Sequence, residues 1–183
     1  GSNNFVGIDV PEEYGGMGLD DYRYNTILSE ERVKAENPGF GHSVQNDLVV
    51  PYLLRHTTEE QKKRWLPKIC SGETIGALAM TEPGGGSDVA AIKTLAKDMG
   101  DHFLVNGSKS FITNGLLADL VIVACKTDSK AGAHGISLII LERGMEGFER
   151  GNKLDKIGQV GQDTAELFFK DVKVPKENLL GEE

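Results

Sequence analysis

The second half of the chain, from Ile75 onward, is a series of short apolar runs separated by turn residues. Regular short strands with no helical segment between them predict an antiparallel barrel or sandwich instead of a doubly wound sheet. The dipeptide Asn106-Gly107 is a strong hairpin signal and predicts a turn between two of these strands. The expected strands are Ile75–Thr81, Ile92–Lys97, His102–Val105, Ser110–Thr113, Leu120–Cys125, Ile136–Leu141 and Ala165–Val174.

The first half of the chain has helical spacing of its apolar residues, so the predicted fold class is α+β. A change of pattern near residues 70–73 divides the chain into a helical domain, 1–72, and a β-domain, 73–183. Three helices are expected. The first runs from Asp20-Asp21 to about Glu36, and the second from Ser43 to His56, with Pro51 as a kink or interruption. The third runs from Glu59 to Ile69, with Thr57 or Thr58 as its N-cap and Gly72 as its terminator.

Composition excludes several classes of function. The net charge of −8 argues against a nucleic-acid footprint, and no apolar run approaches the roughly 20 residues that span a bilayer. We expect no signal peptide, interpret Gly1-Ser2 as an expression-tag remnant, and expect a soluble protein of a reducing intracellular compartment. Cys70 and Cys125 are far apart and have no metal-ligand partner at a useful spacing, so no metal site is predicted.

The stretch from Ala77 to Asp88 is the one most typical of a ligand site. An apolar run predicts a buried strand, which stops in the turn 83–86, Pro-Gly-Gly-Gly, followed by Ser87 and Asp88. Glycines there allow backbone N–H groups to come close to a ligand, and the two polar residues can bond its oxygens. A surface hairpin loop, with Asp88 as a simple cap, explains the same pattern on spacing alone.

The glycine-rich segment and four further stretches resemble the acyl-CoA dehydrogenase family, most closely its long-chain branch. The segment 81–88 resembles the family's flavin-binding signature, although Gly85 replaces the usual Ala. The segment 106–115 is similar to the second flavin segment, with Phe111 where the family usually has Trp. The other three are the early loop 9–16, the helix 58–67 that precedes the β-domain, and the strand 163–172 that closes it.

The resemblance implies an FAD cofactor and a set of binding residues. Four of these binding residues also have a simpler interpretation: Thr81 and Thr113 as residues that favour β-strands, Phe111 as core, and His134 as a solvated loop residue. Glu82 lies beside the flavin segment but is expected to be structural, because the family does not use that position as a base. Flavin contacts are implied for Leu78, Ala79, Met80, Thr81, Glu82, Pro83, Gly84, Gly85, Gly86, Ser87, Phe111, Ile112 and Thr113, and acyl-CoA contacts for Ser87, Ala133 and His134.

The implied reaction is α,β-dehydrogenation of fatty acyl-CoA thioesters in fatty-acid β-oxidation. A glutamate base removes an α-proton, the flavin accepts a β-hydride, and electrons pass to an electron-transfer flavoprotein. The family's base lies in a C-terminal helical bundle, which is expected to begin just beyond Glu183, and the family's first N-terminal helices are also expected to be missing. No catalytic residue is therefore assigned, and the chain is expected to be an inactive central fragment that holds FAD weakly.

Two alternatives stay open. An acyl-CoA oxidase or related flavoenzyme shares the architecture and passes electrons to oxygen, and a non-catalytic acyl-CoA or partner-binding module would need no flavin. The intact protein is expected to be a homotetramer, cytoplasmic in bacteria and in the mitochondrial matrix in eukaryotes. Acyl chain length is not predicted, because the missing helices build most of that pocket in the family.

Overall fold

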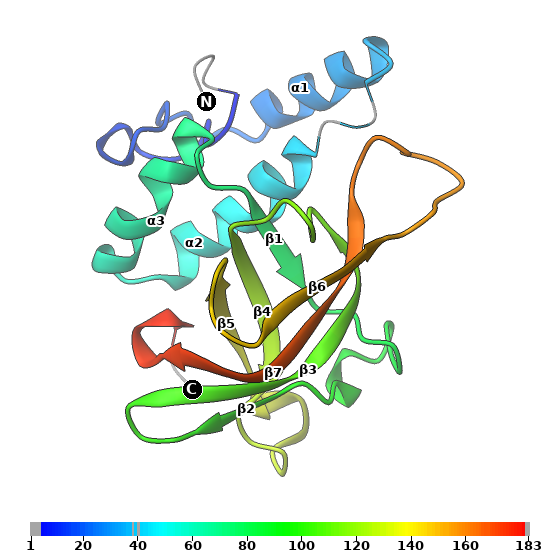
Figure 1. Cartoon of the computed structure of the whole chain (residues 1–183). Coiled ribbons are helices and arrows are strands. Elements are labelled where there is room, and N and C mark those ends of the chain that lie inside the picture. The colour runs from blue at the N-terminus through cyan, green and yellow to red at the C-terminus, as the bar shows by residue number, and fades with distance from the viewer. Residues whose placement is uncertain (1–4, 38, 40, 182–183) are drawn as a thin grey trace.

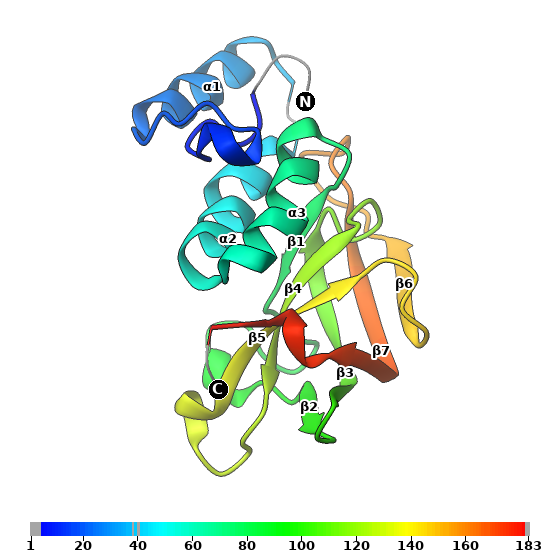
Figure 2. The same cartoon turned by 90° about the vertical axis from the view of Figure 1, so that its left-hand side faces the viewer.

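The computed structural model describes residues 5–37, 39 and 41–181. Helices α1 (Arg23–Lys34), α2 (Val50–His56) and α3 (Glu59–Ser71) form an N-terminal layer on one side of a sheet (Figures 1 and 2). A π-helical turn, Val44–Val49, runs directly into α2. The expected helix from Ser43 to His56 is thus present, and Pro51 falls in the first turn of α2, where its missing N–H is tolerated.

Helix α3 matches its prediction because its start and stop signals are local. Thr58 is the N-cap: its side chain accepts the Gln61 N–H, and the Gln61 side chain accepts the Thr58 N–H, which makes a capping box. Gly72 ends the helix with a left-handed φ of 77°. Trp65 and Leu66 are buried as expected.

The sheet has eight strands in the order β6-β7-β3-β2-β4-β5-β8, with β1 pairing to β4 outside that path. Most pairs are antiparallel, which confirms the predicted fold class, but β1 and β2 each run parallel to β4, which was not predicted. The strands are β1 (Gly76–Ala79), β2 (Leu95–Asp98), β3 (His102–Thr113), β4 (Leu120–Lys126), β5 (Ile136–Glu142), β6 (Phe148–Lys153), β7 (Thr164–Pro175) and β8 (Leu179–Leu180).

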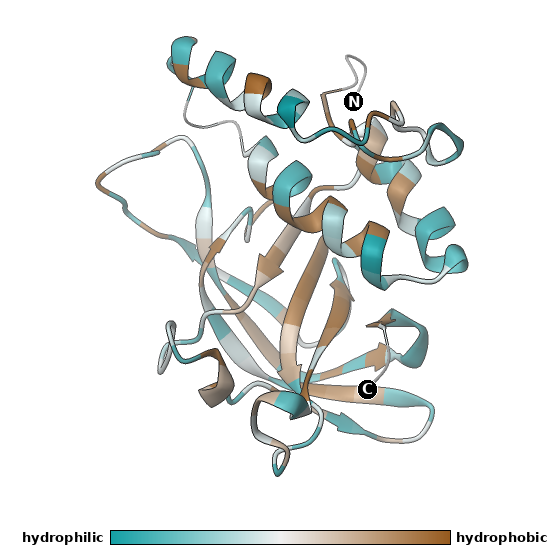
Figure 3. Cartoon of the chain, turned by 180° about the vertical axis from the view of Figure 1, so that it is seen from behind, coloured by the Kyte–Doolittle hydropathy of each residue, from teal (hydrophilic) through white to brown (hydrophobic). Residues whose placement is uncertain are grey.

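Strand β4 is buried on both faces and separates two hydrophobic cores. Val121, Val123 and Cys125 face a core inside the curved sheet. Leu120 and Ile122 face the other way, into a core completed by α2 and α3. Figure 3 shows the hydrophobic colour concentrated along these central strands, whereas α1 is mostly polar. Both cysteines are buried free thiols.

The structure differs in detail from the sequence expectations. Asn106-Gly107 is not a hairpin, because β3 continues through it as one strand with a bulge in its pairing to β7. The Asn106 side chain accepts the Asp171 N–H and donates to the Asp171 carboxylate, so it joins two strands instead of closing a turn. The β2–β3 turn lies at Gly100, with φ 96°. Strand β6 was not predicted, and α1 exposes the apolar side chains Tyr24, Ile27 and Val33.

Among the residues that the structure describes, no helix is long and apolar enough to cross a membrane.

Candidate functional site

The glycine-rich motif forms a tight turn at the end of the segment that follows β1. Glu82 and Gly85 exchange two backbone hydrogen bonds of 3.0 and 3.1 Å across this turn. None of the three glycines, 84–86, has a positive φ. A Cβ added at Gly84 would meet nothing within 4 Å, and those at Gly85 and Gly86 would meet only ordinary contacts at 3.7 and 3.9 Å. Packing within the chain therefore does not require glycine here, whereas close approach of an outside group would.

Glu82 closes the base of the loop that carries this turn. Its buried carboxylate accepts the N–H groups of Lys93 and Thr94, at 2.7 and 2.9 Å, and the ammonium of Lys109 at 3.0 Å. Burial alone raises the pKa of Glu82, but the hydrogen bonds from Thr94, Lys93 and Lys109 outweigh it and hold the pKa below its ordinary value. The group is a fixed carboxylate with every oxygen engaged, which supports the structural role expected for it.

Phe111 lies in a second bulge of β3. The pairing of β3 with β7 shifts register between Lys109 and Ile112, and Phe111 adopts a φ of 61°. A bulky residue with a left-handed φ is an outlier that indicates strain or function. The residue is 68% exposed, so the alternative that Phe111 is ordinary core is wrong.

The two flavin segments implied by the family resemblance lie side by side. The Ser110 N–H donates to the Thr81 carbonyl at 2.9 Å, which places the start of the glycine-rich motif beside the Phe111 bulge. Thr81 and Thr113 are both partly exposed, as a contact with a ligand requires. Ala79 and Ile112 are buried in the sheet core, so neither side chain is exposed to a ligand. Leu78 and Met80 are partly exposed, and Pro83 is exposed.

The three residues implied in acyl-CoA binding come from two turns that contact each other. Ser87 is exposed and precedes the 3₁₀ turn Val89–Ala91. Ala133 and His134 are exposed within a second 3₁₀ turn, 132–135. The two turns pack together at one end of the sheet (Figure 1). A single extended ligand can therefore reach Ser87 and the 133–134 pair.

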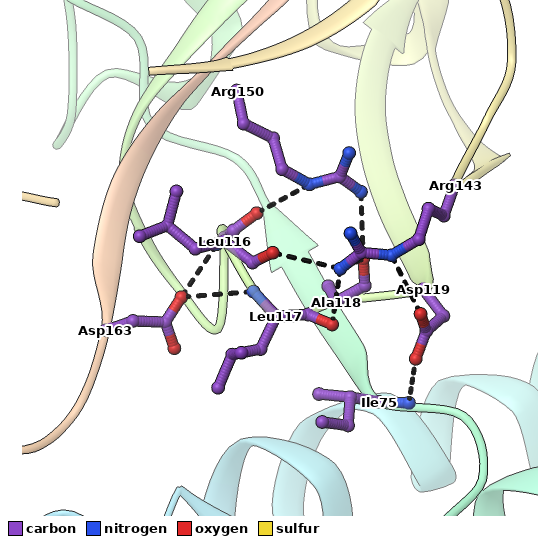
Figure 4. Close-up of polar contacts among 9 residues, drawn as sticks. Ile75, Leu116, Leu117, Ala118, Asp119, Arg143, Arg150 and Asp163 are labelled. Carbon is purple, nitrogen blue, oxygen red and sulfur yellow. Dashed lines mark hydrogen bonds and ion pairs between the residues drawn. The ribbon is translucent and has the colours of Figure 1, made fainter. Parts of the chain in front are cut away.

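Two arginines that the sequence analysis did not identify hold the loop after Thr113 (Figure 4). Arg143 donates to the carbonyls of residues 116, 117 and 118 at 2.9, 2.8 and 3.1 Å, and Arg150 donates to those of 115 and 118 at 3.2 and 2.9 Å. Asp163 accepts the N–H groups of 116 and 117. This network fixes the exit of β3 and so supports Thr113. It depends on contacts distant in sequence, and no local pattern indicates it.

A separate cavity of about 460 Å³ lies between the helices and the sheet. Its wall includes Gly41, His42, Asn114, Leu117 and Asp163, and none of the flavin or acyl-CoA candidates lines it. The candidate site is therefore an open surface at the glycine-rich turn and the Phe111 bulge, not this cavity. An open surface is consistent with a site that other parts of a longer protein complete.

The structure also allows a test of whether the candidate residues fit a flavin. A flavin needs an apolar contact for its ring, hydrogen-bonding groups for its polar edge, and close backbone approach for its phosphates. Phe111, the two threonines and the unobstructed glycine turn offer these on one continuous edge. The residues present thus fit the group.

Comparison with known proteins gives the same assignment over nearly the whole chain. Residues 1–73 match the acyl-CoA dehydrogenase N-terminal domain and residues 77–172 match the acyl-CoA dehydrogenase middle domain. The chain is 48% identical to the mitochondrial long-chain specific acyl-CoA dehydrogenase of Sus scrofa over all of its own length and 43% of that relative.

Solved structures agree. An acyl-CoA dehydrogenase from Geobacillus kaustophilus matches with 53% identity and a TM-score of 0.96, covering 100% of this chain and 48% of that one. An acyl-CoA dehydrogenase from Bacillus anthracis complexed with FAD matches with 38% identity and a TM-score of 0.90, covering 99% of this chain and 31% of that one. The chain spans less than half the length of these relatives. It belongs to the acyl-CoA dehydrogenase family.

Proposed function

We propose that this chain forms the flavin-binding and part of the thioester-binding surface of an FAD-dependent acyl-CoA dehydrogenase. The observation that carries the proposal is the strained, exposed Phe111 beside three glycines that the chain's own packing does not require. Strain and open backbone at one edge are unfavourable unless a ligand uses them. The Bacillus anthracis relative complexed with FAD supports FAD as that ligand.

Each candidate residue has a role on this surface. Phe111 packs against the ring, and the hydroxyls of Thr81 and Thr113 hydrogen-bond its polar edge. The backbone of the turn 83–86 approaches the phosphates, and Ser87 lies between the flavin and the acyl-CoA. Ala133 and His134 contact the CoA part. FAD, when bound, supplies hydride acceptance, and the protein supplies position and polarity.

The reaction proposed for the longer protein is α,β-dehydrogenation of a fatty acyl-CoA thioester, with an electron-transfer flavoprotein as partner and a homotetramer as the assembly. The long-chain relative from Sus scrofa supports the substrate class and a mitochondrial location for eukaryotic members. Glu82 is not the base, because its oxygens are occupied by Lys93, Thr94 and Lys109. We therefore assign no catalytic residue within the chain, and we expect the chain alone to bind FAD weakly and not to turn over.

The first test is a titration of the purified chain with FAD, in which quenching of the flavin fluorescence measures binding. We expect saturable binding that Phe111→Ala weakens. Phe168→Ala is the matched control, because Phe168 is a β-strand phenylalanine with 41% exposure on β7 that belongs to neither flavin segment. Equal affinity of the two variants would contradict the role of Phe111, and absence of any binding would contradict the flavin surface itself.

The second test concerns the reaction. A protein that contains this chain and extends to the length of its relatives should lose the oxidised-flavin absorbance when palmitoyl-CoA is added without oxygen. The isolated chain with FAD should not. Loss of that absorbance in the isolated chain would refute its expected inactivity, and rapid reoxidation of the longer protein by oxygen would favour the oxidase alternative.

A further inference from the structure

Lys109 is a lysine with no solvent exposure in the middle of a β-sheet. Its side chain is among the largest fully buried ones of the described residues. The ammonium donates to the Glu82 carboxylate at 3.0 Å and to the Met80 carbonyl at 2.9 Å. Lysine is almost never fully buried unless it is paired, so this arrangement requires an explanation.

Stability alone does not provide that explanation. Removing two charges from water is costly, and replacing a buried ion pair by uncharged residues of similar size is often neutral or stabilising. Such pairs are retained in some proteins because they fix one arrangement of the groups that they join. The question is therefore which groups the Glu82–Lys109 pair joins.

The pair joins the two segments that are proposed to hold the flavin. Glu82 begins the glycine-rich turn and also anchors the far end of its loop at Lys93 and Thr94. Lys109 stands at the first residue of the bulge that contains Phe111.

In a regular strand, residues two apart point to the same face. The bulge breaks this rule, so that Lys109 points inward to Glu82 while Phe111 points outward. The inward lysine and the outward phenylalanine are therefore two sides of one local structure. The backbone that directs Lys109 to Glu82 is thus the same short segment that directs the Phe111 ring outward.

We infer that the buried Glu82–Lys109 ion pair is a positioning element for the flavin, which fixes the glycine-rich turn relative to the Phe111 bulge so that both contact the same cofactor. Neither side chain touches the flavin in this arrangement. The inference rests on the proposed function, since it requires that the two segments share a flavin.

The test uses the double variant Glu82→Gln with Lys109→Met, which removes both charges and keeps similar side-chain volumes. The matched control is Asp98→Asn with Lys176→Met, which removes an ion pair of 2.7 Å on the outside of the sheet, away from both flavin segments. Far-UV circular dichroism and the melting temperature report folding. FAD affinity from fluorescence quenching and the visible circular dichroism of bound FAD report positioning, because that signal depends on the orientation of the ring.

We expect the Glu82/Lys109 double variant to fold, to bind FAD with a Kd raised about tenfold, equivalent to about 1.4 kcal/mol, and to change the visible circular dichroism of bound FAD. The control variant should match the wild type in FAD affinity and in the visible circular dichroism of bound FAD. A folded double variant with wild-type affinity and an unchanged signal would overturn the inference, whereas failure of the wild-type chain to bind FAD would refute the proposed function instead. If the double variant does not fold, the single variant Glu82→Gln, which keeps a side-chain oxygen as acceptor, takes its place. Its FAD affinity and the visible circular dichroism of its bound FAD then decide in the same way.

Discussion

The left-handed backbone at Phe111 leads to a stability order that is the reverse of the one usual in strands. In an ordinary strand, a protein with glycine at a given position is about 0.5–1 kcal/mol less stable than the same protein with alanine there. A side chain in the left-handed region costs about 1–2 kcal/mol, and glycine removes this cost. At a φ of 61° the second effect is larger, so Phe111→Gly should be more stable than Phe111→Ala by about 1 kcal/mol.

The ring itself contributes little to the stability of the chain without flavin. Complete burial of a phenylalanine is worth about 1.5–3 kcal/mol, and only about a third of the Phe111 ring is covered. Phe111→Ala should therefore cost at most about 1 kcal/mol. Phe148→Ala is the contrasting variant, because Phe148 is 8% exposed and packs against Phe169 with ring centroids 5.3 Å apart; it should cost about 3–5 kcal/mol.

The assay is thermal and urea unfolding of the chain without flavin. The difference between the glycine and alanine variants of Phe111 should appear as about 2–4 °C in melting temperature for a chain of this size. Both variants should bind FAD equally weakly, since both lack the ring. If alanine proved more stable than glycine, the backbone at 111 would be ordinary extended strand and the argument from strain would fail.

Four further outcomes are expected. Thr58→Ala should lower the free energy of unfolding by about 1 kcal/mol in urea, because it removes the capping box of α3. Gly107→Ala should be destabilising by more than about 1 kcal/mol, because its Cβ would lie 2.5 Å from the Thr94 hydroxyl oxygen at a φ of 150°. Gly84→Ala should change the free energy of unfolding by no more than about 0.5 kcal/mol, since its Cβ meets nothing, yet it should weaken FAD binding. A loss of stability as large as the loss of FAD binding energy would contradict the open turn. The pKa of Glu82 is lower in the folded than in the unfolded chain, so its ionised carboxylate should stabilise the fold above the unfolded pKa, and this stabilisation should be lost as pH falls through the folded pKa. The free energy of unfolding, measured against pH for the wild type and for Glu82→Gln, should show this loss in the wild type alone.

The parts of the fold that were predicted correctly depend on local signals. Helix α3 was expected at Glu59–Ile69 and is found at Glu59–Ser71, because a cap and a terminal glycine define its ends whatever surrounds it. Strand β4 was expected at Leu120–Cys125 and ends one residue later, because burial on both faces makes it continuously apolar. The errors have non-local causes. Asn106-Gly107 is a hairpin signal in isolation, and its bond to Asp171, 65 residues away, makes it a bulge.

The candidate site was predictable in composition but not in conformation. Family resemblance selected the segments 78–87 and 111–113, and the structure brings them together. Nothing in the sequence around Phe111 indicates a positive φ, because a bulge is created by pairing with a distant strand. Lys109 was not identified, since the expected hairpin placed it in the connection between two strands, where a lysine is usually solvent-facing. Only its meeting with Glu82, 27 residues earlier, explains its burial.

Three departures from local rules occur at the same edge of this sheet: a strained aromatic residue, a run of glycines that packing within the chain does not require, and a buried lysine. Each alone has an ordinary explanation, such as a tolerated bulge, a surface loop or a structural ion pair. Their coincidence is harder to explain independently, because folded chains usually agree with local preferences except where function requires otherwise. In the proposed site, the glycines would leave room for the phosphates, the bulge would turn Phe111 toward the flavin ring, and the Glu82–Lys109 pair would hold these two features together. One ligand on that edge accounts for all three, which is why FAD affinity, more than stability, is the property that should change when any of them is altered.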